Sequence, residues 1–229
     1  VFRLGGLDLT VDGYYIMVRD AIALSENLTT ANASVAQVLD GTGVSQARFF
    51  INGVHTTTRG IDAIAHYKHR TDSFGVFDFT LAGNVNKYTV DSVPTNTATL
   101  TTPPTLFARN RIITMQSGTP GEKVTGSVDW TKGKIGATAR VTYYGNVVVP
   151  GTLAVNDYST GRRAITDLEL RYQPTETALN LAIGVNNMFD VYPRYNPTNV
   201  NTTGATTFPA YTPWGVNGRY LYARASVKW

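Results

Sequence analysis

Three histidines are the side chains in this sequence that most directly suggest metal chemistry. His66 and His69 are three residues apart, a spacing that brings two ligands together on a helix but places them on opposite faces of a strand. The residues around them alternate apolar and polar side chains, as a strand does. We therefore expect His55, His66 and His69 to be structural or solvated, and we expect no bound metal or cofactor.

Two carboxylates could form an acid–base pair. Asp167 and Glu169 share one face of an expected strand with Arg171, and paired carboxylates can carry general acid–base catalysis. Neighbouring charges on a water-facing wall, however, usually form hydrogen-bonded networks. The sequence contains no serine nucleophile elbow, P-loop or dinucleotide fingerprint. These observations predict that the chain is not an enzyme.

Two further groups of residues could bind a ligand. Guanidinium groups bind anions through charge-assisted hydrogen bonds, and the candidates are Arg109, Arg111, Arg162 and Arg163. Aromatic rings offer apolar contact area, and the candidates late in the chain are Tyr195, Phe208, Tyr211 and Trp214. The same arginines could instead bind lipid phosphates, and the same rings could pack within their own loop.

Strands must position these side chains, because the composition does not favour helices. Only 16% of the residues are charged, against about 25% in an average soluble protein. Thr, Asn, Gly and Tyr take their place, and these residues are typical of strands, turns and wet polar surfaces. We expect almost no helix, and the sequence has no run of about 18 apolar residues that could form a spanning helix.

Eight segments alternate apolar and polar residues with the period of two that a strand requires. They are approximately Leu7 to Arg19, Ser45 to Lys68, Phe77 to Asn86, Glu122 to Trp130, Lys134 to Asn146, Arg162 to Tyr172, Leu179 to Asn186 and Asn217 to Trp229. Short turns at about 69–73, 131–134 and 173–177 alternate with long loops at 20–43, 89–120, 147–161 and 190–216. This sorting is typical of bacterial outer-membrane barrels. An even number of strands places both chain ends on the short-turn side, which puts the C-terminus at the periplasm.

The last segment shows the alternation most clearly. One face carries Leu221, Ala223, Ala225, Val227 and Trp229, and the other carries Tyr220, Tyr222, Arg224, Ser226 and Lys228. One face suits lipid and the other suits water, and the aromatic C-terminus is typical of a strand that closes an outer-membrane barrel. Aromatic residues near strand ends are expected at the membrane interface; these are Trp130, Tyr143, Tyr172 and Trp229.

Charge and cysteine content narrow the function classes. The net charge of +4 is small for 229 residues and its lysines and arginines are scattered, so we expect no nucleic-acid partner. The absence of cysteine excludes disulfides and thiolate sites and suits export through an oxidising compartment. The sequence starts at Val1 without a visible signal peptide, which predicts either a removed leader or the C-terminal piece of a longer protein.

Several segments resemble one family. Residues Leu179 to Pro193 run LNLAIGVNNMFDVYP, which resembles the penultimate-strand motif of TonB-dependent outer-membrane receptors. Asn52 followed by Thr-Arg-Gly-Ile-Asp at 58–62 resembles another strand of that family. The stretches 9–16, 166–170 and 218–224 also look like family strands. The sequence therefore resembles the C-terminal part of such a receptor's β-barrel.

The resemblance implies an all-β, antiparallel transmembrane barrel. Because family members have about 22 strands around a plug, residues 1–229 would form about the C-terminal third, without the plug or the TonB-contacting box. The implied function is TonB-energised uptake of a scarce nutrient, such as a ferric siderophore, a cobalamin-like compound or a carbohydrate. The arginines and loop aromatics named above are the expected ligand contacts.

The resemblance also implies several partners. These are the TonB complex of the inner membrane, outer-membrane lipid, lipopolysaccharide and the barrel-assembly machinery. The apolar face from Leu221 to Trp229 is the expected assembly signal.

The alternative is a self-contained eight-stranded barrel with a structural, anchoring or adhesion role. In that barrel the first and last strands would pair with each other. In a receptor, Leu7 to Arg19 and Asn217 to Trp229 would each pair with a strand outside this sequence.

Overall fold

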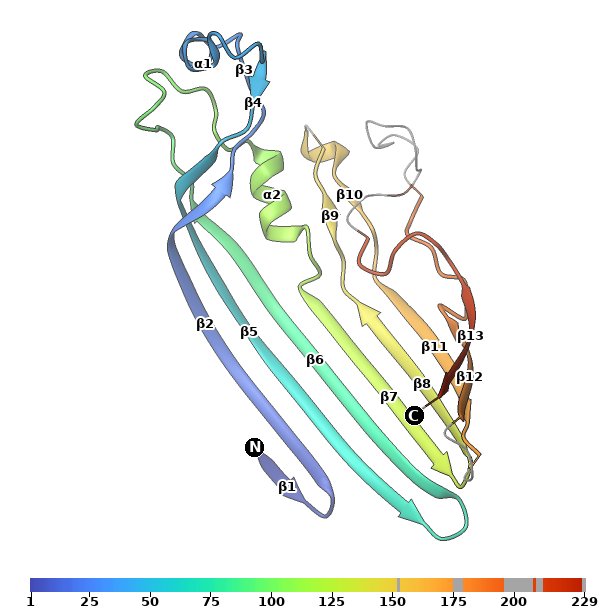
Figure 1. Cartoon of the computed structure of the whole chain (residues 1–229). Helices are drawn as coiled ribbons and strands as arrows, with labels where there is room; N and C mark the ends of the chain where they lie inside the picture. Colours follow the sequence, from blue (N-terminus) through green and yellow to red (C-terminus); the bar gives the residue numbers. More distant parts are fainter. Residues whose placement is uncertain (152, 175–178, 196–207, 209–211, 228–229) are drawn as a thin grey trace.

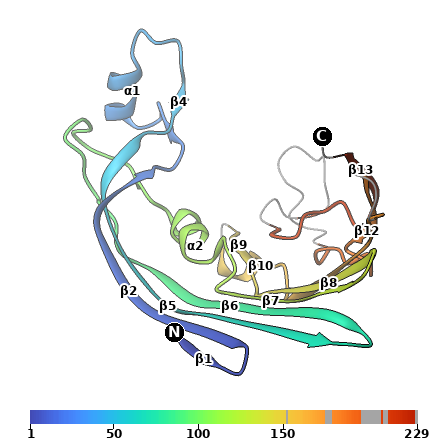
Figure 2. The same ribbon diagram turned by 60° about the horizontal axis from the view of Figure 1, so that its bottom comes forward.

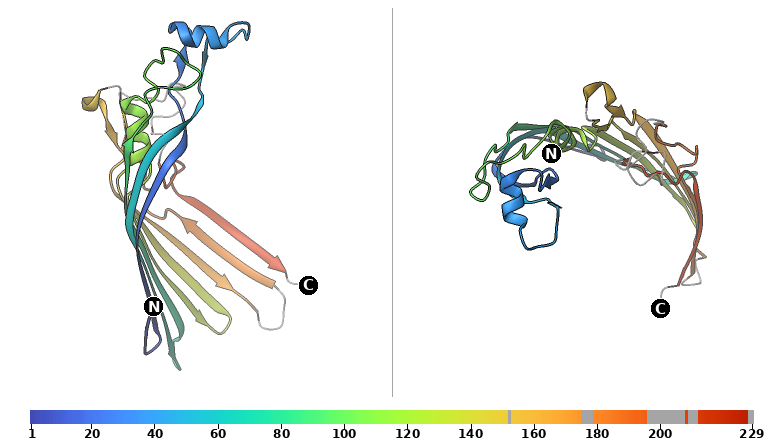
Figure 3. Two further views of the ribbon diagram at one scale, coloured as in Figure 1. Left: turned by 90° about the vertical axis from the view of Figure 1, so that its left-hand side faces the viewer. Right: turned by 90° about the horizontal axis from the view of Figure 1, so that it is seen from above.

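A computed structural model describes residues 1–151, 153–174, 179–195, 208 and 212–227. Its main feature is an antiparallel sheet of nine strands in the order β1-β2-β5-β6-β7-β8-β11-β12-β13. The strands are β1 (Phe2–Leu4), β2 (Leu7–Leu24), β5 (Phe50–Thr71), β6 (Gly75–Ser92), β7 (Glu122–Lys132), β8 (Ile135–Tyr144), β11 (Arg163–Tyr172), β12 (Leu179–Asn186) and β13 (Tyr220–Val227). Strands that follow one another along the chain lie side by side (Figure 1), and the sheet curves into an open arc (Figure 3).

The strand register joins the apolar faces of neighbouring strands into one surface, which we call the outer face. Leu168 of β11 lies opposite Ala139 of β8 and Val185 of β12, and Val185 lies opposite Leu221 of β13. The exposed members of this face include Val11, Met17, Ile61, Leu81, Val85, Leu170, Ile183 and Leu221. A continuous apolar surface of this extent is stable only against another apolar phase. The predicted alternation is therefore confirmed for these strands.

The opposite, polar face lies on the concave side of the arc. Tyr144 on this face contacts Trp214, and the chain segment around Trp214 lies inside the arc (Figure 2). The helix α2 (Arg109–Ser117) also lies on this side, where it packs near β6. The concave face is thus lined by polar side chains and covered in part by loops.

The long connections form a structure of their own at one end of the sheet and partly on its concave side, which we call the loop lobe. The first connection contains β3 (Leu28–Thr29), α1 (Ala33–Leu39) and β4 (Gln46–Ala47), the second contains α2, and the third contains β9 (Val148–Val149), η1 (Ala154–Asn156) and β10 (Tyr158–Ser159). Asn32 caps α1 by accepting hydrogen bonds from the backbone N–H groups of Ser34 and Val35. A buried cluster joins the first two connections to β5: Leu28, Val35, Ile51, Val54, Leu100, Leu106 and Phe107.

The structure corrects several expected boundaries. The first strand continues past Arg19 to Leu24, the strand expected from Ser45 begins at Phe50, and β6 extends to Ser92, inside the expected loop. The two helices α1 and α2 lie in connections that the composition presents as irregular. No described helix has the length and apolar character needed to cross a membrane.

The sheet is open at both edges in the described part of the chain. β1 pairs with residues Leu7–Leu9 of β2. For these three residues, the expectation that the partner strand lies outside this sequence is therefore wrong. β13 pairs with β12, and no pairing of described residues joins it to β1 or β2. The described strands therefore do not form a small closed barrel.

Candidate ligand-binding site

An aromatic side chain with two cationic neighbours lies at the loop-lobe end of the polar face. Tyr144 is the last residue of β8, and the register places it opposite Lys123 of β7 and Arg163 of β11. The Lys123 Nζ lies 5.4 Å from the centre of the Tyr144 ring, a cation–π distance. Arg163 donates a hydrogen bond of 2.9 Å to the backbone carbonyl of Arg162. The Lys123 ammonium therefore lies beside the ring, and Arg163 is placed next to Tyr144 by the strand register.

Trp214 completes this group, which we call the Tyr144 site: Lys123, Tyr144, Arg163 and Trp214. The rings of Tyr144 and Trp214 are 5.8 Å apart and inclined by 44°. The Trp214 Nε1 is buried and has no hydrogen-bond partner. Leaving a buried donor unpaired costs about 1–3 kcal/mol, so this N–H is a group that a ligand could satisfy. The site thus offers one cation beside two aromatic rings, a second cationic residue on the neighbouring strand and one free donor.

Tyr158 lies in the same electrostatic neighbourhood. Its hydroxyl is buried and has no hydrogen-bond partner. Burial raises the pKa of Tyr158, while the positive charges of Arg194 and Arg163 act in the opposite direction. The phenol therefore stays neutral and is a second free donor near Arg163.

Two of the predicted ligand contacts hold the loop lobe together. Arg109 at the start of α2 donates to both carboxylate oxygens of Asp157, one of them at 2.9 Å, and to the Gly151 carbonyl at 3.2 Å. The hydrogen bonds from Arg109 lower the pKa of Asp157, and the carboxylate in turn raises the pKa of Arg109. Arg111 donates to the Ser25 carbonyl at 3.1 Å, and its Nε lies 3.8 Å from a Glu26 carboxylate oxygen. A ligand role for Arg109 and Arg111 stays a prediction, whereas their structural role is visible.

The other predicted contacts are more scattered. Arg162 forms an ion pair with Glu122 at 3.0 Å. The Tyr195 side chain is exposed, and Tyr211 lies outside the described residues. Phe208 stacks on Tyr192. Of the eight candidate ligand contacts, Trp214 lies against the Tyr144 ring and Arg163 lies opposite Tyr144 in the strand register. Lys123 and Tyr144 were not among the predicted contacts, because their partnership depends on the pairing of two strands.

A network of charges and hydrogen bonds lines the polar face farther from the loop lobe. Arg171 donates to Asp129 at 2.6 Å and lies 3.4 Å from Glu169. Glu169 also accepts a hydrogen bond of 2.8 Å from the Tyr222 hydroxyl and one of 3.2 Å from Arg224. Asp167 instead accepts a hydrogen bond from the Asn187 backbone N–H at 2.9 Å. Both carboxylates are thus held by hydrogen bonds, as the sequence predicted, and both line one polar hollow together with Asp129, Arg140 and Arg171.

Comparison with known proteins identifies the family. The family model described as TonB dependent receptor-like, beta-barrel matches residues 1–188. The chain belongs to this family. No curated protein sequence matches the chain. The family consists of receptors, so the resemblance drawn from the sequence and the prediction that the chain is not an enzyme are both confirmed.

Solved structures of TonB-dependent receptors share the fold of this chain. The FrpB iron transporter from Neisseria meningitidis (F3-3 variant) is 17% identical with a TM-score of 0.60, and the two structures superpose over 98% of this chain and 29% of that one. A structure titled copper transporter OprC gives 15% identity, a TM-score of 0.59 and the same two shares. A mutant (G324V) of the ferric enterobactin receptor PfeA from Pseudomonas aeruginosa gives 14% identity and a TM-score of 0.58 over 99% and 29%. The chain thus spans less than a third of the length of these proteins.

Membership of the TonB-dependent receptor barrel family explains the two faces of the sheet. Family members are outer-membrane proteins, and in such barrels the outward side chains contact lipid while the inward side chains line a polar interior. The outer face corresponds to the lipid side and the polar face to the interior. The Tyr144 site therefore belongs to the interior wall.

The histidines take structural positions on this wall. His66 lies on the polar face, with its Nε2 2.6 Å from an Asp78 carboxylate oxygen, and His69 lies opposite Phe77 on the outer face. The His55 Nε2 lies 3.4 Å from Asp20. Among the described residues, no group of three or more His, Cys, Asp or Glu side chains could hold a metal ion.

Proposed function

We propose that the protein is part of an outer-membrane receptor that takes up a scarce nutrient with energy supplied through TonB. The observation that carries this proposal is the Tyr144 site on the interior wall. A lysine beside two aromatic rings, with an arginine on the neighbouring strand, suits a ligand that is anionic and partly apolar. Among a ferric siderophore, a cobalamin-like compound and a carbohydrate, this chemistry favours an anionic metal chelate. The family match supports the receptor class.

The proposal includes an orientation and a set of partners. The loop lobe faces the outside of the cell, and the short turns and the C-terminus face the periplasm. The TonB complex acts through a region outside residues 1–229, in the whole receptor. Lipopolysaccharide surrounds the outer leaflet, and the barrel-assembly machinery recognises the strand that carries Leu221, Ala223, Ala225 and Val227.

Charge removal at the Tyr144 site of the full-length receptor tests the ligand proposal. Arg163→Gln and Lys123→Gln should each weaken binding of an anionic ferric chelate by about tenfold or more, because a hydrogen bond to a charged group contributes about 1.5–3 kcal/mol. Binding is measured by titration of the purified receptor with ferric hydroxamate, catecholate and citrate complexes. Uptake of radioactive iron is measured in cells with and without TonB.

Arg59→Gln is the matched control. Arg59 lies near the same end of the sheet but belongs to the outer-face register, opposite Tyr15, so its replacement should leave affinity unchanged. Equal losses in all three variants, or none, would refute the Tyr144 site. Uptake that persists without TonB would refute the energised transport. An inserted receptor that binds no chelate and supports no uptake would favour a structural or adhesive role.

A further inference from the structure

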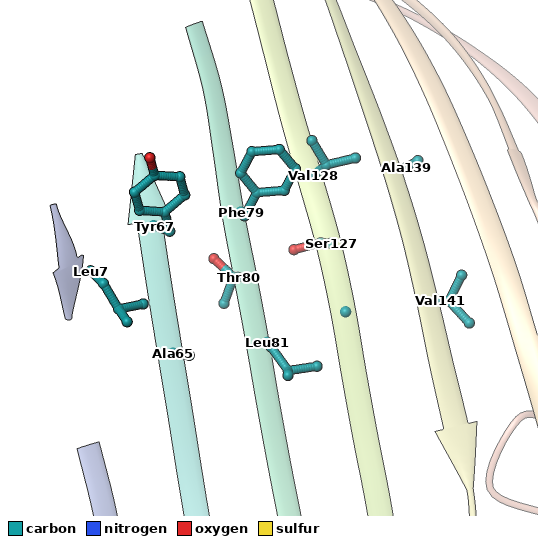
Figure 4. Close-up of a pocket in the computed structure, with 11 residues that line it drawn as sticks. Leu7, Ala65, Tyr67, Phe79, Thr80, Leu81, Ser127, Val128, Ala139 and Val141 are labelled. Carbon is teal, nitrogen blue, oxygen red and sulfur yellow. The ribbon is translucent and has the colours of Figure 1, made fainter. Parts of the chain in front are cut away.

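The outer face contains two apolar hollows that meet. The first lies between Leu7, Tyr67, Phe79 and Val141 (Figure 4), and the second extends from Phe77 and Trp130 toward Ile183 and Leu221. Both are lined by Val128 and Ala139. We call the pair of hollows the outer groove. It crosses the sheet from β2 to β13, and the two hollows meet at β7 and β8.

Small residues between larger ones create the groove. Ala139 lies between Val128 and Leu168 in the register, and Ala137 lies between Trp130 and Leu170. Because methyl groups stand lower than the neighbouring rings and branched chains, β8 forms the floor and its neighbours form the walls. Glu169 borders the second hollow, but its carboxylate is bonded to Tyr222 and Arg224. The mainly apolar lining of the groove therefore suits hydrocarbon chains.

A ladder of rings fixes the wall nearest the short turns. Tyr67 stacks on Phe79 with ring centres 6.3 Å apart, Phe79 on Phe77 at 6.1 Å, and Phe77 contacts Trp130 at 6.5 Å. The Trp130 indole N–H donates a hydrogen bond of 2.7 Å to the Phe74 carbonyl. The amphipathic rings of Tyr67 and Trp130 in this ladder mark the level of the lipid headgroups.

Positive charge gathers just beyond this ladder. Lys132 ends β7, and Lys134 lies in the turn between β7 and β8. Lys132 follows Trp130 by two residues, so it belongs to the outer-face register, and both Lys132 and Lys134 are exposed. Neither lysine forms an ion pair with a described residue. Two free cations thus stand at the headgroup end of the groove.

We propose that the outer groove binds one anionic glycerophospholipid of the periplasmic leaflet, such as phosphatidylglycerol. Its two acyl chains lie in the two hollows, and Lys132 and Lys134 bind its phosphate. Charge complementarity selects the anionic lipid over a zwitterionic one, since each lysine near a membrane surface contributes about 1 kcal/mol toward an anionic headgroup. This inference rests on the membrane location and orientation given under the proposed function.

Native mass spectrometry of the full-length receptor, released from nanodiscs, tests the site. The probes are phosphatidylglycerol, phosphatidylethanolamine and lipid A in equal amounts. Wild-type receptor should retain phosphatidylglycerol preferentially, and Lys132→Gln and Lys134→Gln should each lower its relative occupancy about fivefold. Ala139→Phe, which fills the floor of the groove with an apolar ring, should also release the bound lipid.

Two control variants distinguish specific binding in the outer groove from general contact of the outer face with lipid. Lys87→Gln removes an outer-face lysine at the opposite end of β6, and Ala63→Phe enlarges an outer-face alanine outside the groove; neither should change the occupancy. Equal retention of the three lipids, or equal loss in test and control variants, would overturn the proposal. Preference for lipid A would place the groove in the other leaflet and overturn it as well. Iron uptake should be unchanged in Lys132→Gln, so failure of the lipid site and failure of the receptor function give different results.

Discussion

Replacement of Ile183 by arginine should destabilise the inserted protein by about 2–4 kcal/mol, the cost of an arginine on the lipid side of a barrel near the middle of the bilayer. Ile183 is 61% exposed on the outer face and lies between Leu170 and Ala223. A guanidinium at this position loses its hydration shell without gaining a partner. The free energy of unfolding of the full-length receptor in lipid bilayers, measured by denaturant titration, checks this value.

Asn186→Arg on the same strand is the control. Asn186 is exposed on the polar face, three residues from Ile183, and should tolerate the same side chain within about 0.5 kcal/mol, as surface positions usually do. Equal destabilisation by both arginines would show that the outer face does not contact lipid.

Replacement of Leu106 by alanine should open the loop lobe. Leu106 is 2% exposed and packs in the cluster that joins the first two long connections to β5. Removing a buried leucine side chain costs about 2–5 kcal/mol. If the lobe opens as a local unit, amide hydrogen exchange at 28–39 and 100–107 should accelerate by at least about thirtyfold. Exchange in β7, β8, β11 and β12 should stay unchanged, because none of these strands contributes a residue to the cluster.

Leu153→Ala provides the comparison for this change. Leu153 is 62% exposed in the third connection, so its truncation should leave hydrogen exchange unaltered. Unchanged exchange in Leu106→Ala would mean that the cluster does not hold the lobe. Accelerated exchange over the whole sheet would mean that lobe and sheet unfold together.

The strands could be predicted from the sequence because each has one apolar and one polar environment. The segment from Leu179 to Asn186 was predicted with its correct bounds. In this segment every second residue contacts lipid, so a shift of one residue would reverse both faces. Strand ends were less predictable. Beyond Arg19 and Val85 the two faces of the strands no longer have clearly different apolar and polar surroundings. β2 and β6 continue there through backbone pairing, although apolar and polar residues do not strictly alternate.

The helices were missed because they are short and are stabilised by tertiary contacts. Asn32 is a favourable N-cap, but the seven residues of α1 include buried side chains of a lobe that only the folded chain creates. The helix α2 has no side-chain cap, and Arg109 and Arg111 hold it through acids distant in the sequence, Asp157 and Glu26. Ion pairs between residues so far apart in the sequence leave no pattern in the residues of the helix itself.

The ligand site was predicted in part. Arg163 and Trp214 were among the candidates because their residue types suit an anion and a ring. Lys123 and Tyr144 could also have been found, since the tight turn at Gly133, with its positive φ of 57°, sets the β7–β8 register and therefore their pairing. The contact of Trp214 with Tyr144 could not be predicted, because Trp214 lies in a long connection far along the sequence from β8 and their contact depends on tertiary packing.

The measurement that most directly tests the two-sided wall uses spin labels on single cysteines in the full-length receptor, reconstituted in lipid bilayers. The described strands contain no native cysteine to interfere. Labels at Leu81 and Leu170 of the outer face should be relaxed mainly by oxygen, which dissolves in lipid. Labels at Thr80 and Ser127, which lie opposite each other on the polar face, should be relaxed mainly by a water-soluble nickel chelate. The reverse pattern, or one pattern at all four positions, would contradict a barrel wall with lipid on one face and a polar interior on the other.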